Sequence, residues 1–267
     1  MNYSFRIAFV GAGRVATHLA PALVRAGHQV AVVWSRSESS AQLLAHKTGA
    51  TPMHGANPDF SAVAADLYLL AVPDDAVKAV LLAAKWPAGA LLAHTSGALP
   101  LGVFGAGPQV RGGVFYPLQT FSPGRVLDWA TVPLCLEATS EADFAVLEAV
   151  AQSVSQRVLR VPTPARQQLH VAAVFACNFT NHLLGIADAL LAEARLPADM
   201  LAPLIRETVD KALTNPPFTV QTGPAIRHDA STIALHTRAL GAHPTWQLVY
   251  QQLTASIQEA AETRPQT

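Results

Sequence analysis

Short runs of consecutive apolar residues recur through the first 160 positions and constrain the fold more than any other feature of the sequence. Segments with the 3.6-residue apolar spacing of helices lie between them, at 15–26, 38–47, 74–85 and 141–155. Strands that are apolar on both faces and alternate with helices are typical of a parallel sheet covered on both sides. We therefore predict an α/β fold, with a doubly wound parallel sheet whose strands are residues 6–10, 29–34, 67–72, 89–94, 110–116, 132–137 and 157–161.

The pattern changes after Pro162 and Pro164. From there on the spacing is helical, with one long helix to about residue 195 and further helices at about 197–213, 229–240 and 245–262. We place a domain boundary at this change. The sequence thus predicts a Rossmann domain over residues 1–161 and an all-α domain over residues 162–267.

A glycine motif follows the first predicted strand and opens the first predicted helix. It reads Gly11-Ala12-Gly13-Arg14-Val15-Ala16, a G-x-G-x-x-A pattern in which the first glycine allows a tight turn and the second lets the backbone approach a pyrophosphate. The start of the helix offers unpaired N–H groups and a positive dipole end to phosphate. Such a motif between a strand and a helix predicts dinucleotide binding, with Gly11, Gly13, Arg14 and Val15 at the cofactor.

The end of the second strand bears on which dinucleotide binds. An NAD site has an acidic residue about twenty positions past the fingerprint, but this chain has Ser35-Arg36-Ser37 there. Arg36 can pair with a 2′-phosphate, and the two hydroxyls can donate to it, so NADP is favoured over NAD. The alternative is that Arg36 is only a solvated surface charge. Glu38 fits the first turn of the next helix.

Two further strands end in polar loops. Val72 and Pro73 precede Asp74, and His94 precedes Ser96. Ligands of open α/β sheets bind beyond the carboxyl ends of the strands, so these loops should flank a nicotinamide. Asp74 could instead cap the following helix, and Ser96 could equally serve a turn.

Composition excludes several classes of protein. Lys plus Arg and Asp plus Glu both number 18, so no net charge draws the chain to nucleic acid or to an anionic membrane. The apolar stretch from 169 to 191 is interrupted by Asn178, Asn181, His182 and Asp188, which argues against a membrane span. No histidine spacing indicates a metal. The start of the chain does not resemble a signal peptide, and two separate cysteines fit buried free thiols, so we expect a soluble cytoplasmic protein.

With these motifs in view, the chain resembles a superfamily that includes pyrroline-5-carboxylate reductase, 3-hydroxyisobutyrate dehydrogenase and deazaflavin-dependent NADP oxidoreductases. Its members pair a Rossmann domain with a helical domain like the C-terminal one of 6-phosphogluconate dehydrogenase. More closely, it resembles a bacterial family of NADP oxidoreductases with a Rossmann-like domain and a C-terminal domain of unknown function. The resemblance lies in residues 11–16, 71–75, 94–97, 115–121, 170–178 and 222–236. Arg166 stands where that pattern has a lysine, and His228 where it has a glycine.

The resemblance implies an active site on the long helix and a homodimer formed through the helical domain. By it, His170 is the candidate proton donor and Asn178 an orienting group, although either could be an ordinary interface residue. Regular helical geometry would place Asn181 about 20° from His170 around the helix axis, so Asn181 is a candidate for substrate binding. Arg227 is a second one, since its guanidinium could bind a carboxylate or a phosphate. Asp229 fits an N-cap.

These residues predict an NADP-dependent reductase or dehydrogenase acting on a small carbonyl or imine. His94, Ser96, His170 and Asn178 would line the reaction site. One alternative is hydride exchange between NADP and a deazaflavin. Another is a protein that binds NADP(H) as a sensor without turnover.

Overall fold

The computed structural model describes residues 4–106 and 110–263. It divides into two compact units, Met1–Asn178 and Phe179–Thr267. Residues 1–3, on which the expectation about a signal peptide partly rests, lie outside the described part.

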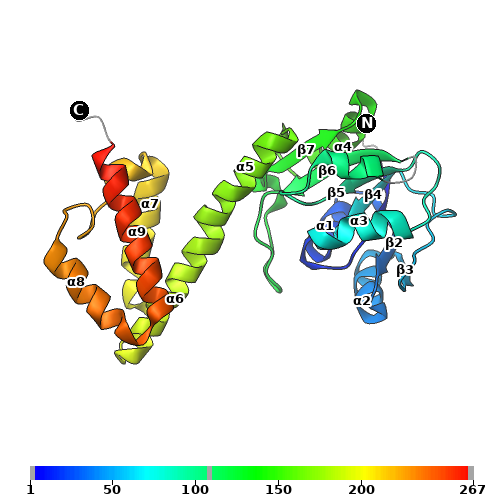
Figure 1. Cartoon of the computed structure of the whole chain (residues 1–267). Coiled ribbons are helices and arrows are strands. Elements are labelled where there is room, and N and C mark those ends of the chain that lie inside the picture. Colours follow the sequence, from blue (N-terminus) through cyan, green and yellow to red (C-terminus); the bar gives the residue numbers. More distant parts are fainter. Residues whose placement is uncertain (1–3, 107–109, 264–267) are drawn as a thin grey trace. The chain divides into compact units, whose positions relative to one another are not determined.

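The first unit is built on one sheet of eight strands in the order β3-β2-β1-β4-β5-β6-β7-β8 (Figure 1). All neighbouring strands are parallel except β6 and β7, which are antiparallel. The chain order reverses between β1 and β4, which is where a doubly wound fold binds its ligand. The strands are β1 (Arg6–Val10), β2 (Gln29–Ser35), β3 (Thr51–His54), β4 (Leu67–Leu70), β5 (Leu91–His94), β6 (Arg111–Pro117), β7 (Leu134–Ala138) and β8 (Val158–Arg160).

Helices cover both faces of this sheet. Ile7 and Phe9 of β1 pack in one apolar cluster with residues of α1 (Arg14–Arg25), α2 (Glu38–Thr48) and α4 (Glu141–Gln152). Ala8 and Val10 of the same strand pack in another with α3 (Asp74–Ala83). Successive residues of a strand thus pack into the apolar clusters on opposite faces of the sheet, which is why the strands are apolar at consecutive positions. The predicted α/β fold with a doubly wound sheet is confirmed.

One strand of the sheet was not predicted. β3 reads Thr51-Pro52-Met53-His54 and is mostly exposed at the sheet edge. Proline is tolerated in edge strands, and a strand with little buried surface lacks the apolar signal that reveals the others. Of the two cysteines, Cys135 is buried as expected, but Cys177 is exposed, so the expectation of a buried thiol is wrong for Cys177.

Only helices follow β8 in the described part of the chain. They are α5 (Thr163–Ala173), a π-helical segment at Val174–Phe179, α6 (Thr180–Glu193), α7 (Ala202–Thr214), α8 (Ala230–Ala239) and α9 (Pro244–Glu262). Short 3₁₀ turns occur at Leu101–Ala106, Trp129–Thr131, Ala198–Leu201, Pro217–Val220 and Leu240–Ala242. Helical structure thus begins beside the predicted boundary at 162, while α5 belongs to the first compact unit.

The helices of the second unit bury few side chains of their own. Among its described residues, 179–263, only Ala225 and Thr254 are buried. The continuous helix Thr163–Glu193 is 31 residues long, and its most apolar window has a mean hydropathy of 1.3. By length and composition alone it could cross a membrane, but core helices of soluble proteins meet the same criteria.

Candidate active site

The glycine turn after β1 requires its first glycine. Gly11 has a φ of +114°, and a Cβ there would lie 2.4 Å from the carbonyl oxygen of Ala71. Its N–H donates to the carbonyl oxygen of Trp34 at 2.8 Å, which holds the turn against β2. The close approach of β1 and β4 at this point therefore excludes any side chain at position 11.

The start of α1 is open to a ligand. Gly13 is its N-cap and no side-chain hydrogen bond caps the helix, whose first turn also carries no acidic residue. A Cβ at Gly13 would meet Ala71 at an ordinary 3.6 Å, so packing alone does not require glycine there. Arg14 is exposed and Val15 is partly buried. The first N–H groups of α1 are thus placed to bind an anion, as the cofactor hypothesis needs.

The three residues at the end of β2 have different tasks. Ser37 is the N-cap of α2 and its hydroxyl accepts the N–H of Ser40, while the hydroxyl of Ser35 accepts the N–H of Ser37. Arg36 is exposed, and in residues 4–106 and 110–263 no hydrogen bond or ion pair engages its guanidinium. Glu38 bonds Gln42 instead of Arg36. Arg36 is therefore a free charge on the loop that follows β2, between two serines that shape this loop.

Ser96 organises the loop after β5. Its hydroxyl donates to Asp74 Oδ2 at 2.7 Å and accepts the N–H groups of Ala98 and Leu99, both at 3.0 Å. The N-cap of α3 is Pro73, next to the partly buried Val72, and no side-chain bond caps that helix. Asp74 thus accepts a hydrogen bond from the loop after β5 and does not cap α3. The alternative in which Asp74 caps the helix that follows it is therefore wrong.

The His94 side chain is fully buried at the end of β5. Its Nδ1 accepts the N–H of Ser96 at 3.2 Å, and its ring stacks on Phe104. Burial, followed by the nearby Arg166 charge, lowers the pKa of His94 to about 4, so the ring is neutral near pH 7. In this structure the ring has no surface to offer a ligand. The prediction that His94 lines the reaction site is therefore wrong for its side chain, which supports the Ser96 loop from within the core.

A buried ion pair fastens α5 to the sheet. Arg166 has no exposed surface, and its Nη1 donates to Glu137 Oε2 of β7 at 2.5 Å. Its Nη2 donates to the carbonyl oxygen of Leu99 in the Ser96 loop. Thr163 donates to both Glu137 oxygens, from its N–H at 2.9 Å and its hydroxyl at 2.7 Å. A lysine has no fork of donors to bridge two elements in this way, which accounts for arginine at this position.

His170 lies one turn beyond Arg166 on α5 and contacts the end of β6. Its Nδ1 is 3.2 Å from the hydroxyl oxygen of Tyr116, with the two rings edge to face at a centroid distance of 6.1 Å. The side chain of His170 is partly buried, whereas Tyr116 is only 9% exposed. The predicted proton donor is thus held at the carboxyl edge of the sheet, the same edge at which β1, β2, β4 and β5 end.

Asn178 and Asn181 are exposed, and the π-helical segment Val174–Phe179 separates Asn181 from His170. A π turn holds more residues than an α turn. The predicted 20° between His170 and Asn181 assumed a regular α-helix, and that premise is wrong.

In the second unit, Arg227 is exposed ahead of α8. Asp229 is the N-cap of α8 and accepts the N–H of Thr232 at 3.1 Å, which confirms its predicted capping role. Across the described residues no group of three or more His, Cys, Asp or Glu is placed to hold a metal ion.

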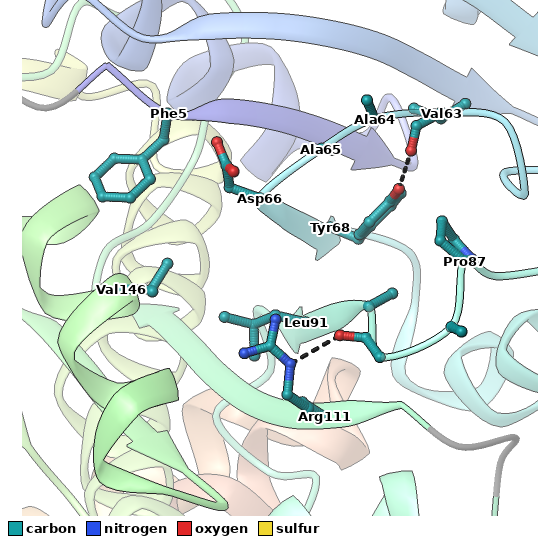
Figure 2. A pocket seen from close by; sticks show the side chains of 13 residues that line it. Phe5, Val63, Ala64, Ala65, Asp66, Tyr68, Pro87, Leu91, Arg111 and Val146 are labelled. Atoms are coloured by element: carbon teal, nitrogen blue, oxygen red, sulfur yellow. Dashed lines mark hydrogen bonds between the residues drawn. The ribbon is translucent and has the colours of Figure 1, made fainter.

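A separate pocket of about 330 Å³ opens at the opposite, amino-terminal edge of the sheet (Figure 2). Phe5, Asp66 and Arg111 line it where β1, β4 and β6 begin. Arg111 is already engaged, since its Nε donates to the carbonyl oxygen of Gly89 and its Nη1 to Asp143. This pocket is therefore not part of the site at the carboxyl edge.

Sequence reasoning assigned no role to Tyr116, Glu137 or Gly97. Tyr116 belongs to the block 115–121 that carries the resemblance, and this block was the one available signal for it. Glu137 ends a predicted strand as a lone acidic residue after an apolar run, a position that calls for a buried partner.

Two family models cover most of the chain. One described as a Rossmann-like domain matches residues 2–118, and one described as a domain of unknown function, DUF2520, matches residues 132–257. No curated protein matches the sequence as a relative.

Several solved structures are similar over nearly the whole chain. A putative NADP oxidoreductase of Bacteroides fragilis is 40% identical, with a TM-score of 0.84 and coverage of 96% of this chain and 98% of that one. A reductive aminase of Aspergillus terreus, solved with NADPH and ethyl levulinate, is 17% identical with a TM-score of 0.69 over 97% and 94% of the two chains. A 1-pyrroline-5-carboxylate reductase of Streptococcus pyogenes is 12% identical with a TM-score of 0.60 over 96% and 99%. The last two share the fold. The identity to the first shows that this chain, in which a Rossmann-like domain precedes the DUF2520 domain, belongs to the family of the Bacteroides fragilis protein.

Proposed function

We propose that this protein is an NADP-dependent oxidoreductase that transfers hydride between NADP(H) and a small carbonyl or imine. The observation that carries the proposal is the uncapped start of α1 next to the unpaired guanidinium of Arg36. A pyrophosphate fits the first and a 2′-phosphate the second. The names of the family member from Bacteroides fragilis and of the NADPH-bound reductive aminase support the same cofactor.

In this proposal NADPH supplies the hydride when it is bound, and the chain supplies binding groups and a proton. The turn at Gly11 and Gly13 holds the pyrophosphate, and Val72 and Pro73 border the nicotinamide. His170 gives a proton to the oxygen or nitrogen of the substrate as the hydride arrives at the adjacent carbon. The Ser96 hydroxyl already donates to Asp74, so Ser96 acts by holding its loop.

The substrate side is supported by fewer observations. Asn178 is the proposed orienting group, and Asn181 and Arg227 remain predicted substrate contacts. The names of the reductive aminase and the pyrroline-5-carboxylate reductase, which share the fold, favour a substrate with a C=N bond. If the protein only senses NADP(H), replacement of His170 changes no turnover because there is none; in an enzyme, turnover falls while NADPH affinity holds.

Calorimetric titration with NADPH and NADH tests the cofactor. We expect NADPH to bind more tightly, and Arg36→Ala to weaken it about ten- to a hundredfold, as befits the loss of one charged hydrogen-bond donor. NADH affinity should stay unchanged because NADH lacks the 2′-phosphate. Arg25→Ala, which removes a charge from the opposite end of α1, is the matched control. An equal loss of affinity for both nucleotides, or no loss of affinity for NADPH, would contradict the assignment of Arg36 to the 2′-phosphate.

We also propose that the protein works as a cytoplasmic homodimer joined through its helical unit. The support is the lack of burial in α6, α7 and α8, which contain no buried residue, while large apolar side chains such as Leu213 and Phe218 are 80% and 70% exposed. A helical unit with so few buried residues needs a further apolar surface to pack against for stability. A second copy supplies such a surface.

A further inference from the structure

Three segments far apart in the sequence crowd together around one residue without a side chain. A Cβ on Gly97 would lie 2.7 Å from Nδ1 of His170 and 2.7 Å from Cζ of Tyr116. Real Cβ atoms do not approach other heavy atoms so closely, so only glycine lets the imidazole and the phenol occupy their present places. Gly97 follows β5, Tyr116 lies in β6 and His170 lies in α5.

The elements that carry the His170 and Tyr116 rings are also held by interactions outside this contact. Arg166, one turn before His170, ties α5 to Glu137 of β7 and to the loop that carries Gly97. Tyr116 pairs with Cys135 of the same strand β7 in the sheet. The backbone on both sides of the hydrogen bond is thus fixed by buried groups.

From this geometry we infer that Tyr116 is a positioning residue for His170. Its hydroxyl occupies Nδ1 of the imidazole and leaves Nε2, on the far side of the ring, as the nitrogen that exchanges a proton with the substrate. A phenol can do this in both charge states of the ring, because it accepts from a protonated Nδ1 and donates to an unprotonated one. The inference rests on the proposed function of His170 as proton donor.

The phenol keeps its own proton in this role. Burial raises the pKa of Tyr116 to about 12, helped by the nearby Cys135, Cys177 and Asp74 and opposed by Arg166. Tyr116 is therefore neutral at any pH at which the protein would work. In the transfer step the Nε2–H bond of the protonated imidazole breaks as the new O–H or N–H bond of the product forms. The ring returns to neutral while Tyr116 still holds Nδ1.

Ring ¹⁵N spectra of the full chain test the hydrogen bond without any assay of activity. His170→Asn identifies the His170 signals by their loss. Because Nδ1 of His170 is hydrogen-bonded to Tyr116 in the wild-type protein, we expect the ¹⁵N shift of Nδ1 to change in Tyr116→Phe, where this partner is lost, and to change more than the shift of Nε2. No change of the Nδ1 shift in Tyr116→Phe, or a change confined to Nε2, would overturn the inference.

Kinetics test the consequence for turnover, with NADPH oxidation followed on a cyclic imine and on a keto ester as probes. Tyr116→Phe should lower kcat about tenfold with KM unchanged, less than the hundredfold or greater loss expected for His170→Ala. Tyr68→Phe is the matched control, because Tyr68 is also buried and its hydroxyl donates to the carbonyl oxygen of Val63 at the opposite edge of the sheet (Figure 2). It should leave both the spectra and kcat unchanged.

The two experiments separate the possible failures. If His170→Ala retains full turnover, the proposed role of His170 as proton donor is wrong, and the positioning role of Tyr116 is wrong as well. If His170→Ala loses turnover but Tyr116→Phe loses none, the proposed function stands and the positioning role falls. Gly97→Ala provides an independent check, since its Cβ should separate the two rings and change the Nδ1 shift of His170 in the same way.

Discussion

At the scale of single residues, His228 adopts a backbone conformation that its side chain disfavours. Its φ is +51°, one of two positive φ values among the described non-glycine residues, and its side chain is exposed. The family resemblance leads us to expect a glycine here, and glycine adopts this left-handed region without a steric penalty. A histidine with this positive φ therefore carries local strain just ahead of α8.

Substitutions at His228 should report this strain in urea unfolding curves. His228→Val should lower the free energy of unfolding by about 1–2 kcal/mol, because a β-branched residue tolerates the left-handed region worse than histidine does. His228→Gly should be neutral or stabilising by up to about 1 kcal/mol, since relief of strain offsets the greater freedom of glycine in the unfolded chain. The control is His46→Val, an exposed position in ordinary helical geometry on α2. Destabilisation by His228→Gly beyond that of His228→Val would show that the conformation is unstrained.

Sequence alone located residues whose task is set by their neighbours in the chain. Gly11 follows a strand and precedes a helix, and Asp229 precedes the helix that it caps, so each could be placed from a local pattern. The contact of Tyr116 with His170 spans 54 positions, and that of Arg166 with Glu137 spans 29. No periodicity connects such residues, which is why the supports of the site became visible only in the folded chain.

At the scale of elements, the ion pair between α5 and β7 makes the attachment of the helix sensitive to acid. Burial would raise the pKa of Glu137, but hydrogen bonds from Arg166 and Thr163 outweigh it and hold the pKa below its usual 4.5. A lowered pKa in the folded state stabilises the fold above the unfolded value, and this stabilisation is lost as the pH falls through the folded value.

Glu137→Gln should therefore destabilise the protein at pH 7 and have progressively less effect below about pH 4.5. Thermal unfolding of both proteins between pH 7 and pH 3.5 measures the difference. Glu141→Gln is the matched control, because Glu141 pairs with Arg160 at the protein surface and exposed pairs contribute little. A Glu137→Gln effect that is constant over this pH range would mean that the pKa of Glu137 is the same in the folded and unfolded states, so that the ion pair does not lower it.

Elements with a strong apolar pattern were predictable, and those without one were not. The buried strands β4 and β5 stood out because each is apolar on both faces. The exposed edge strand β3 carries no such signal. The π-helical segment Val174–Phe179 shows why helix arithmetic failed for Asn181: its residues are as compatible with an α-helix as those around it, so its wider turn was not visible in the sequence.

At the scale of the whole molecule, sedimentation velocity should show a homodimer at micromolar concentration. The double variant Val209→Glu with Leu213→Glu adds two charges to exposed apolar positions of α7 and should weaken the dimer about tenfold or more. Leu43→Glu, at an exposed position on α2, is the control and should leave it intact. A monomeric wild-type protein would refute the dimer, and binding to lipid vesicles in its place would assign the apolar helices to a membrane.

The crowding at Gly97 also limits how this chain can diverge in evolution. A lineage that acquires a side chain at position 97 must give up the aromatic ring at 116, the imidazole at 170, or the spacing between them. The three positions are therefore expected to be inherited as a set and to change as a set, independently of the cofactor glycines. Homologues that have lost all three can still carry an intact dinucleotide fold, so a shared fold would mark common ancestry among them and the triplet would mark shared chemistry.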